Sequence, residues 1–211
     1  MRILIYSDVH GNLPAFETVL KDAGPCDSYI CLGDLVNYGP WSNECVDLAM
    51  SLPNSTILMG NHEEAFISGF YSGSNTLVQD FFRQTLLNFD RFQQIKSFLP
   101  SYKVEEYLCI HTVHNQNIYP DTIIELDKNY IIGHSHHQFL IKNNGFNLYN
   151  AGSVGQNRKI INIASYLIFD TDLNKIEMNL TKFDINLVID KMKDLLYPQN
   201  CILYYKQKQK F

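Results

Sequence analysis

The sequence predicts an α/β fold in which two mixed β-sheets pack together and are flanked by helices. In the first half, short apolar runs alternate with segments of helical periodicity, which is typical of parallel βαβ units. In the second half, turn sequences join strands into hairpins. The chain has 211 residues, of which 45% are apolar and 18% are charged, so it can bury a sizeable core and is not disordered. We expect one domain over residues 1–211.

The first half begins with a buried strand that ends at a polar cluster and leads into a helix. Asn12 precedes this helix as its N-cap, Pro14 lies in its first turn, and Gly24-Pro25 ends it. Further elements follow in alternation. The strands are expected over residues 2–7, 28–32 and 55–59, and a second helix over residues 42–51.

The second half is predicted to contain more helix and then hairpins. Residues 62–99 read as mostly helical, because apolar residues recur near a period of about 3.6 residues, with a break at 69–73. Asp184 caps what we expect to be the last helix, Pro198 ends it, and the basic tail is expected to fray. Strands are expected over 101–112 and 129–132, with hairpins turning at Asn144-Gly145 and within 163–180.

Composition excludes several classes of function. The formal net charge is -5, which argues against an extended nucleic-acid surface. The five cysteines contain no C-x-x-C spacing, so we expect reduced thiols and a cytoplasmic location. The apolar run before Asp8 is too short for a signal peptide, and no stretch has the length of a membrane span, so no membrane partner is expected.

Metal-type ligands follow the predicted strands. Parallel strands bring their carboxyl ends together, so these residues are expected to meet although they lie far apart in sequence. The Asp-x-His and His-x-His pairs place two ligands on one side of an extended chain. Mixed His, Asp and Asn ligands suit Mn²⁺, Fe²⁺ or Zn²⁺. The motifs are Asp8-Val9-His10, Gly33-Asp34, Gly60-Asn61-His62-Glu63, Ile110-His111 and Gly133-His134-Ser135-His136.

In this order, the motifs resemble the calcineurin-like metallophosphoesterase superfamily. Residues 33–40 (GDLVNYGP) and 150–156 (NAGSVGQ) are similar to a compact, single-domain bacterial branch of it. The resemblance covers nearly the whole chain. It implies a four-layer αββα sandwich of two mixed sheets, with a metal site at the carboxyl ends of the strands.

The resemblance also implies a binuclear site that hydrolyses a phosphate ester or anhydride by a hydroxide held between two divalent transition-metal ions. Manganese would be the first choice, with iron, zinc or nickel as alternatives. His62 would donate a proton to the leaving group, steadied by Glu63. The first ion would be held by Asp8, His10 and His136, the second by Asn61, His111 and His134, and both by Asp34.

The sequence departs from the family pattern after His111, where Thr112 stands in place of the usual glycine. His114 is therefore a rival ligand, although His111 follows the apolar strand directly. Asn37, Tyr38 and Arg158 are candidate substrate contacts. The expected substrate is small, phosphorylated and nucleotide-like.

Other functions are open at this point. The protein could be a phosphodiesterase acting on other diesters, or a non-catalytic interaction scaffold like the retromer subunit built on this fold. A β-lactamase-like metallohydrolase would need an H-x-H-x-D-H run, which the sequence lacks. The natural substrate, the metal, the oligomeric state and the roles of His114 and His137 do not follow from the sequence.

Overall fold

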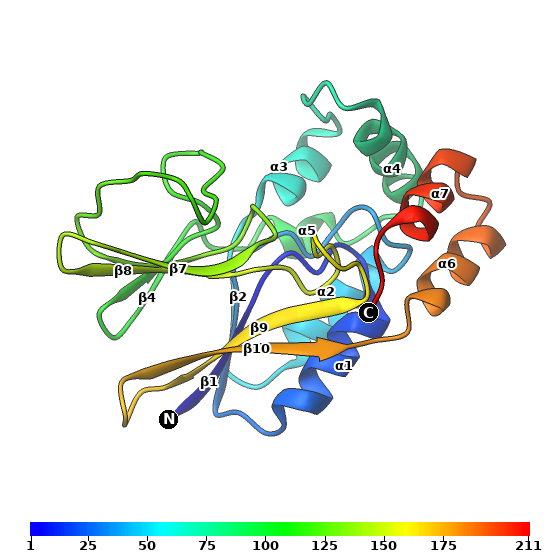
Figure 1. Cartoon of the computed structure of the whole chain (residues 1–211). Helices are drawn as coiled ribbons and strands as arrows, with labels where there is room; N and C mark the ends of the chain where they lie inside the picture. The colour runs from blue at the N-terminus through cyan, green and yellow to red at the C-terminus, as the bar shows by residue number, and fades with distance from the viewer.

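Two five-stranded mixed sheets form the centre of the computed structural model, which describes residues 1–211 (Figure 1). Strands β1, β2 and β3 are parallel in the first sheet, and β5, β6 and β8 are parallel in the second. The first sheet has the order β10 (Lys175–Lys182), β9 (Ile163–Asp170), β1 (Arg2–Tyr6), β2 (Ser28–Cys31), β3 (Ser55–Ile57). The second has the order β4 (Tyr102–Val104), β5 (Tyr107–Cys109), β6 (Asn129–Ile132), β8 (Phe146–Ala151), β7 (Gln138–Asn143). The predicted α/β class with two mixed sheets is confirmed, whereas the single domain stays a prediction.

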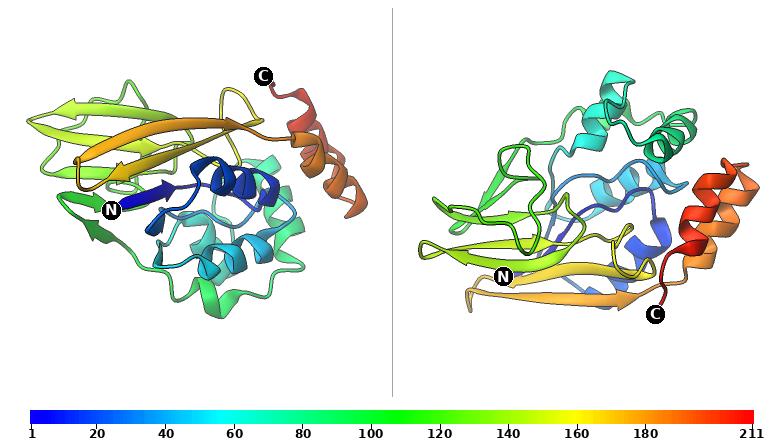
Figure 2. Two further views of the ribbon diagram at one scale, coloured as in Figure 1. Left: turned by 90° about the horizontal axis from the view of Figure 1, so that it is seen from below. Right: turned by 45° about the horizontal axis from the view of Figure 1, so that its top comes forward.

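The helices share one large core with the first sheet. Figure 2 shows α6 and α7, in orange and red, following the end of β10. There α6 packs against α1, and α7 packs against α4. The seven helices are α1 (Leu13–Ala23), α2 (Ser42–Ser51), α3 (Asn61–Ser68), α4 (Thr76–Leu86), α5 (Phe92–Ile95), α6 (Ile185–Asp194) and α7 (Gln199–Gln207).

Side chains of β1 alternate between two cores, as a strand buried on both faces requires. Leu4 and Tyr6 face the helices, whereas Ile3 and Ile5 lie between the two sheets. A third core covers the outer face of the second sheet. Segment 111–128, which contains no helix, provides apolar side chains such as Ile118 to this core.

Several local predictions are confirmed. Asn12 caps α1 by accepting a hydrogen bond from the Ala15 amide at 3.2 Å. Asp184 caps α6 by accepting one from the Asn186 amide at 2.9 Å. Strands β7 and β8, and likewise β9 and β10, form the expected hairpins.

Two local predictions were wrong. Residues 101–112 form the hairpin of β4 and β5 instead of one strand, because the chain turns at Glu105, whose φ is 48°. Helix α6 ends at Asp194, and Pro198 precedes α7 instead of ending α6. The basic tail, residues 206–210, begins within α7, which ends at Gln207, and the backbone of Phe211 exchanges two hydrogen bonds with the Asn162 side chain. The expected fraying of this tail stays a prediction.

Candidate metal centre

Side chains from both sheets converge where the parallel strands end. Five of the seven histidines belong to groups in which each residue offers one nitrogen or oxygen atom within 4.8 Å of the others. The three groups are Asp8-His10-His136, His10-Asp34-His62 and Asp34-His111-His134.

The group of Asp8, His10 and His136 is buried. The Nε2 atoms of the two histidines are 3.0 Å apart. Oδ1 of Asp8 lies 3.1 Å from Nε2 of His136 and 3.6 Å from Nε2 of His10. Three donor atoms therefore point at one small volume.

The second group of donor atoms, that of Asp34, His111 and His134, lies next to the first. Nε2 of His111 is 3.1 Å from Nδ1 of His134 and 3.3 Å from Oδ2 of Asp34. Oδ1 of Asn61 lies 3.0 Å from the His111 nitrogen and 2.9 Å from the His134 nitrogen. Asn61 thus completes a set of four donors.

Asp34 lies between the two groups. Its Oδ2 atom is 3.3 Å from Nε2 of His111 in one group and 3.9 Å from Nε2 of His10 in the other. The same oxygen is 4.0 Å from Nε2 of His62. One carboxylate oxygen therefore faces both groups and the imidazole beside them.

In both aspartates, Asp8 and Asp34, one carboxylate oxygen accepts a backbone hydrogen bond and the other oxygen faces the histidines. Oδ2 of Asp8 accepts a hydrogen bond from the His134 amide, and Oδ1 of Asp34 accepts one from the His62 amide, both at 2.9 Å. Oδ1 of Asp8 is buried and has no hydrogen-bond donor. A buried carboxylate oxygen without a donor is costly unless a cation approaches it.

Three of the imidazoles are oriented by backbone carbonyls. Nδ1–H of His10 donates to the Val36 carbonyl at 3.1 Å, that of His111 to Leu32 at 2.9 Å, and that of His136 to Gln156 at 2.9 Å. A carbonyl only accepts, so Nδ1 carries the hydrogen and Nε2 of the neutral ring presents a lone pair to its group. This arrangement is typical of metal-binding histidines.

These residues fit divalent transition metals. In the first group, two histidine lone pairs and an orphaned carboxylate oxygen face one another, which is unfavourable without a cation. Two nitrogens that bind one ion at about 2.1 Å and at a right angle are about 3 Å apart, the spacing found in both groups. Imidazole and carboxylate donors together favour manganese, iron, nickel or zinc over calcium and magnesium.

The backbone adopts a rare conformation at five of these residues. Asp8, His10, Asp34, His134 and His136 all have positive φ, between 51° and 69°. For residues other than glycine this conformation is strained, and such strain gathers at functional sites. The surrounding packing therefore forces these side chains into place.

Charge coupling separates the histidines into two kinds. Burial would lower the pKa of His111, but the Asp34 carboxylate outweighs it and raises that pKa to about 10. Burial lowers the pKa of His136 to about 4 and that of His62 to about 3. Without metal, His111 is therefore the proton-bearing partner of Asp34, and an ion in the second group must displace this proton.

Gly60 is required by close approach, which leads to a testable prediction. A Cβ atom here would meet the Asp34 side chain and would lie 2.8 Å from Oε2 of Glu63. We expect Gly60→Ala to lower the free energy of unfolding by about 1–3 kcal/mol through overpacking. It should also weaken metal binding at least tenfold. Loss of a residue that supports metal ligands typically lowers metal affinity by about 10–100-fold, and tenfold is the low end of that range.

Gly24→Ala is the matched control, because nothing lies within 4 Å of its Cβ position although its φ is 66°. It should cost stability through backbone strain alone and leave metal affinity unchanged. Urea denaturation of the metal-free proteins and Mn²⁺ titration measure the two effects. Equal metal affinity of Gly60→Ala and Gly24→Ala would contradict the prediction.

Glu63 and His62 have different partners from those that the resemblance implied. The Glu63 carboxylate accepts hydrogen bonds from the amides of Gly60, Asp34, Leu35 and Val36, at 2.7–3.2 Å. Burial and the Asp34 charge raise the pKa of Glu63 to about 7, whereas four N–H donors favour its ionised form. Glu63 thus holds the loop that carries Asp34, and none of its hydrogen bonds goes to His62.

The side chain that does contact the His62 ring is Asn37, at 2.8 Å from Nδ1. Asn37 is fully buried, and Tyr38 is nearly so, with its ring 4.8 Å from that of His10. Of the three predicted substrate contacts, only Arg158 is exposed. Its guanidinium lies beside Tyr204, where it opposes the burial that raises the pKa of that phenol.

The two remaining histidines lie outside these groups. His114 is exposed and belongs to none of them. His137 is half-buried, and its Nδ1 atom lies 2.7 Å from the Ser135 carbonyl. The structure thus brings His111, and not His114, to the other donors.

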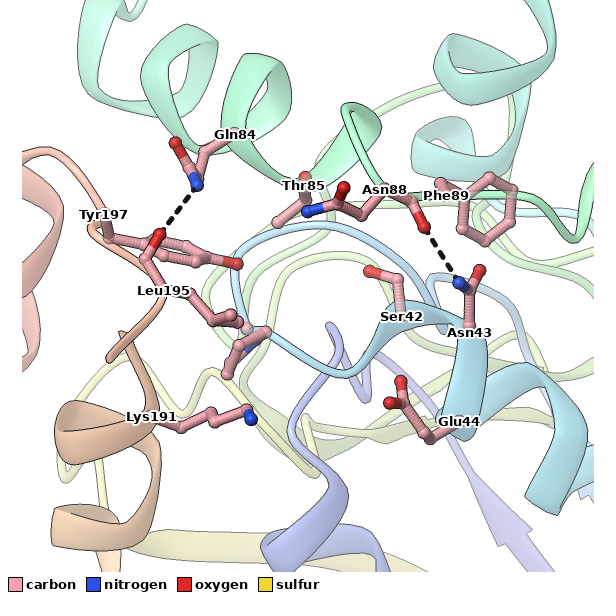
Figure 3. A pocket seen from close by; sticks show the side chains of 12 residues that line it. Ser42, Asn43, Glu44, Gln84, Thr85, Asn88, Phe89, Lys191, Leu195 and Tyr197 are labelled. Carbon is pink, nitrogen blue, oxygen red and sulfur yellow. Dashed lines mark hydrogen bonds between the residues drawn. The ribbon is translucent and has the colours of Figure 1, made fainter. Parts of the chain in front are cut away.

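One cavity opens at the site, and a second lies beyond Asn37. One of about 470 Å³ opens beside the second group and is lined by Asn61, His111 and His134 together with Thr112 and Asn115. A second, of about 210 Å³, lies between α2, α4 and the α6–α7 connection (Figure 3). The hydroxyls of Ser42 and Thr85, which line this second cavity, are hydrogen-bonded to Asn37.

Sequence reasoning missed Tyr71 and the residues of α7. The Tyr71 ring stacks on the His62 ring, with 5.7 Å between centroids. From α7, Tyr204 donates a hydrogen bond to Gln156 at 3.2 Å, and the carbonyl of Gln156 accepts from His136. The GFYSG segment that contains Tyr71 looked like a helix break, and no motif marked it.

No helix of the structure is long and apolar enough to span a membrane. Histidine and aspartate side chains cluster at the strand ends of two mixed sheets, an arrangement that fits the class of metal-dependent phosphoesterases.

Comparison with known proteins agrees with this class. Residues 1–188 match the calcineurin-like phosphoesterase family, and the chain belongs to this family. It is 30% identical to the uncharacterized protein MJ0912 of Methanocaldococcus jannaschii, covering 90% of this chain and 91% of that protein. A metallophosphoesterase from Sphaerobacter thermophilus is similar in structure, with a TM-score of 0.83, 28% identity and 98% of both chains covered. Hypothetical protein PH1004 from Pyrococcus horikoshii OT3 shares the fold, with a TM-score of 0.76, 14% identity and 97% of both chains covered.

Proposed function

We propose that the protein is a binuclear phosphoesterase that hydrolyses a small phosphorylated substrate. The observation that carries the proposal is Asp34 Oδ2, which lies 3.3 Å from Nε2 of His111 and 3.9 Å from Nε2 of His10. A carboxylate in this position suits a ligand shared by two ions.

In this proposal, the first group of donors holds one ion and the second group holds the other. Two divalent ions would lower the pKa of a water molecule and neutralise charge that develops on a phosphoryl group. Their four positive charges exceed the two negative charges of Asp8 and Asp34, so the site attracts phosphate although the protein is acidic. Asp8, His10 and His136 would hold the first ion, Asn61, His111 and His134 the second, and Asp34 both.

The proposed metal is manganese, with iron, zinc or nickel as alternatives, since imidazole and carboxylate ligands suit all four. The cavity of about 470 Å³ beside His111 and His134 has the volume of a small-molecule site. Exposed Arg158 would bind a further phosphate oxygen through its planar fork. These features support a nucleotide-like substrate.

A non-catalytic scaffold is the weaker candidate, because all seven proposed ligands are present and converge. The likeness to the Sphaerobacter metallophosphoesterase, at 28% identity over 98% of both chains, also favours an enzyme. We further propose a cytoplasmic location, which the five free cysteines support.

A metal-reconstituted activity screen tests the proposed function. After removal of metal, Mn²⁺ is expected to restore hydrolysis of at least one class among phosphomonoesters, phosphodiesters and dinucleoside polyphosphates. Two ions per chain should be bound at saturation, as measured by elemental analysis. Stoichiometric binding without hydrolysis of any of the three classes would favour the scaffold, and binding of one ion would contradict the binuclear site.

A further inference from the structure

The amide of Asn37 has only one orientation that satisfies its neighbours. Oδ1 accepts a hydrogen bond from the Tyr38 backbone amide at 2.7 Å. The Thr85 hydroxyl lies 3.1 Å from the same oxygen, but its single hydrogen also has the Phe81 carbonyl as an acceptor at 2.8 Å. A backbone N–H cannot rotate away or accept, so rotating the side-chain amide by 180° would place two donors against each other. The NH₂ group of Asn37 therefore faces His62.

This orientation determines which nitrogen of His62 carries the hydrogen. Nδ1 lies 2.8 Å from the NH₂ group of Asn37. The amide donates, so Nδ1 accepts and carries no hydrogen, and the hydrogen of the ring is on Nε2. Nε2 is the atom that points toward Oδ2 of Asp34, at 4.0 Å.

The backbone is strained where Asn37 makes this contact. Asn37 and Tyr38 both have positive φ, 74° and 59°. The backbone N–H of Asn37 donates a hydrogen bond to the Ser42 hydroxyl at 3.1 Å. Ser42 of α2 and Thr85 of α4, whose hydroxyls contact Asn37, both line the cavity in Figure 3. Asn37 is thus a buried positioning residue and not a free substrate contact.

We propose that Asn37 keeps His62 as a hydrogen-bond donor through Nε2–H, and that the enzyme therefore prefers substrates whose leaving group departs as a stable oxyanion. This inference rests on the proposed phosphoesterase function. The substrate class is phosphoanhydrides, including those of nucleotides, and aryl phosphates, in contrast to simple alkyl esters.

The chemistry of the step follows from the position of the hydrogen. An oxygen derived from water bonds to phosphorus, the bond between phosphorus and the leaving oxygen breaks, and the electron pair stays on that oxygen. Nε2–H donates a hydrogen bond to it and keeps its hydrogen, because losing it from a neutral ring would leave a strongly basic imidazolate. The leaving group takes its proton from solvent. A doubly protonated ring would instead direct Nδ1–H at the NH₂ group of Asn37.

The first test reads the ring directly and needs no activity. Side-chain ¹⁵N spectra of the metal-free protein at one neutral pH should show Nδ1 of His62 without hydrogen and Nε2 with hydrogen, assigned by loss of the signals in His62→Ala. In Asn37→Asp, a carboxylate can accept from Nδ1, and we expect both nitrogens to be protonated. A hydrogen on Nδ1 of wild-type His62 would overturn the inference.

The second test uses aryl and alkyl phosphates whose leaving groups span several pKa units, with Mn²⁺ bound. Asn37→Asp should raise the ratio of kcat/KM for poor over good leaving groups by at least tenfold, because it permits proton donation, a contribution of about 10²–10⁴-fold. His62→Ala should lower kcat by similar factors across the series. Asn43→Asp, on the wall of the same cavity (Figure 3), adds the same charge without touching His62 and should leave the ratio unchanged.

The outcomes separate the two proposals. If wild-type protein hydrolyses these substrates and His62→Ala slows poor leaving groups far more than good ones, His62 donates a proton and the inference is wrong. An unchanged ratio in Asn37→Asp contradicts it as well. If no substrate is hydrolysed while the ¹⁵N spectra show the expected ring, the phosphoesterase function fails, and the role of Asn37 in orienting His62 stands.

Discussion

Asp34→Ala is expected to abolish retention of both metal ions and to lower kcat/KM by more than about a thousandfold. The reason is that Oδ2 of Asp34 faces Nε2 of His10 and of His111, so the substitution removes a ligand from both ions at once. A metal ion contributes several kcal/mol to the stabilisation of a phosphoryl-transfer transition state, and each factor of ten in rate corresponds to about 1.4 kcal/mol.

The same variant should lose the stabilisation that bound metal provides. An ion present at a hundred times its dissociation constant raises the free energy of unfolding by about 2.7 kcal/mol. Wild-type protein should show this increase on addition of Mn²⁺, and Asp34→Ala should show none. Urea denaturation with and without Mn²⁺ measures it, alongside elemental analysis.

Two further variants serve as controls for Asp34→Ala. Asp34→Asn keeps the oxygen that accepts from the His62 amide at 2.9 Å, so it separates loss of charge from loss of folding. Asp121→Ala removes an exposed carboxylate that belongs to none of the groups and should behave as wild type. If Asp34→Asn retains two ions and wild-type activity, Asp34 is not a shared ligand.

The features of the fold that follow from local rules could be predicted from the sequence. The apolar run of β1, the cap at Asn12 and the turn at Asn144-Gly145 each depend on a few neighbouring residues. Convergence of distant motifs such as Asp8 and His134 was predictable too, because parallel strands must align their carboxyl ends. These rules are sufficient to predict the class of fold and the position of the site.

What could not be predicted depends on contacts between distant segments. Helix α7 was missed because its buried residues, among them Cys201 and Tyr205, lie in one continuous apolar run of five residues, which shows no helical period. The partner of the His62 ring depends on how the loop after Asp34 folds back on α3, where four backbone amides bind Glu63. Spacing in the sequence contains no information about such a choice.

The loop from Asp34 to Tyr38 combines functions that appeared separate in the sequence. It supplies the Asp34 carboxylate that faces both groups, the Val36 carbonyl that orients His10, and the Asn37 side-chain amide that contacts His62. Glu63 ties the same loop to the start of α3, which carries Asn61 and His62. A change in this loop should therefore alter both groups of ligands together.

A matched pair of substitutions, His111→Ala and His114→Ala, decides between the two histidines that follow β5. His111 is 7% exposed and its Nε2 atom lies within 3.3 Å of donor atoms of Asp34, Asn61 and His134. His114, three residues on, is exposed and belongs to no group of donor atoms. We therefore expect His111→Ala to retain one ion and to lose more than about a hundredfold in kcat, since even a residue that only supports a metal ligand costs about 10–100-fold.

His114→Ala should keep two ions and a kcat within about twofold of wild type, as expected of an exposed position away from the chemistry. Elemental analysis and steady-state kinetics with Mn²⁺ measure both variants under one condition. The pH of the assay matters, because the second ion competes with the proton that Asp34 holds on His111, so its affinity falls as the pH is lowered. Loss of the second ion in His114→Ala, with two ions retained in His111→Ala, would reverse the assignment and move the second site toward segment 112–116.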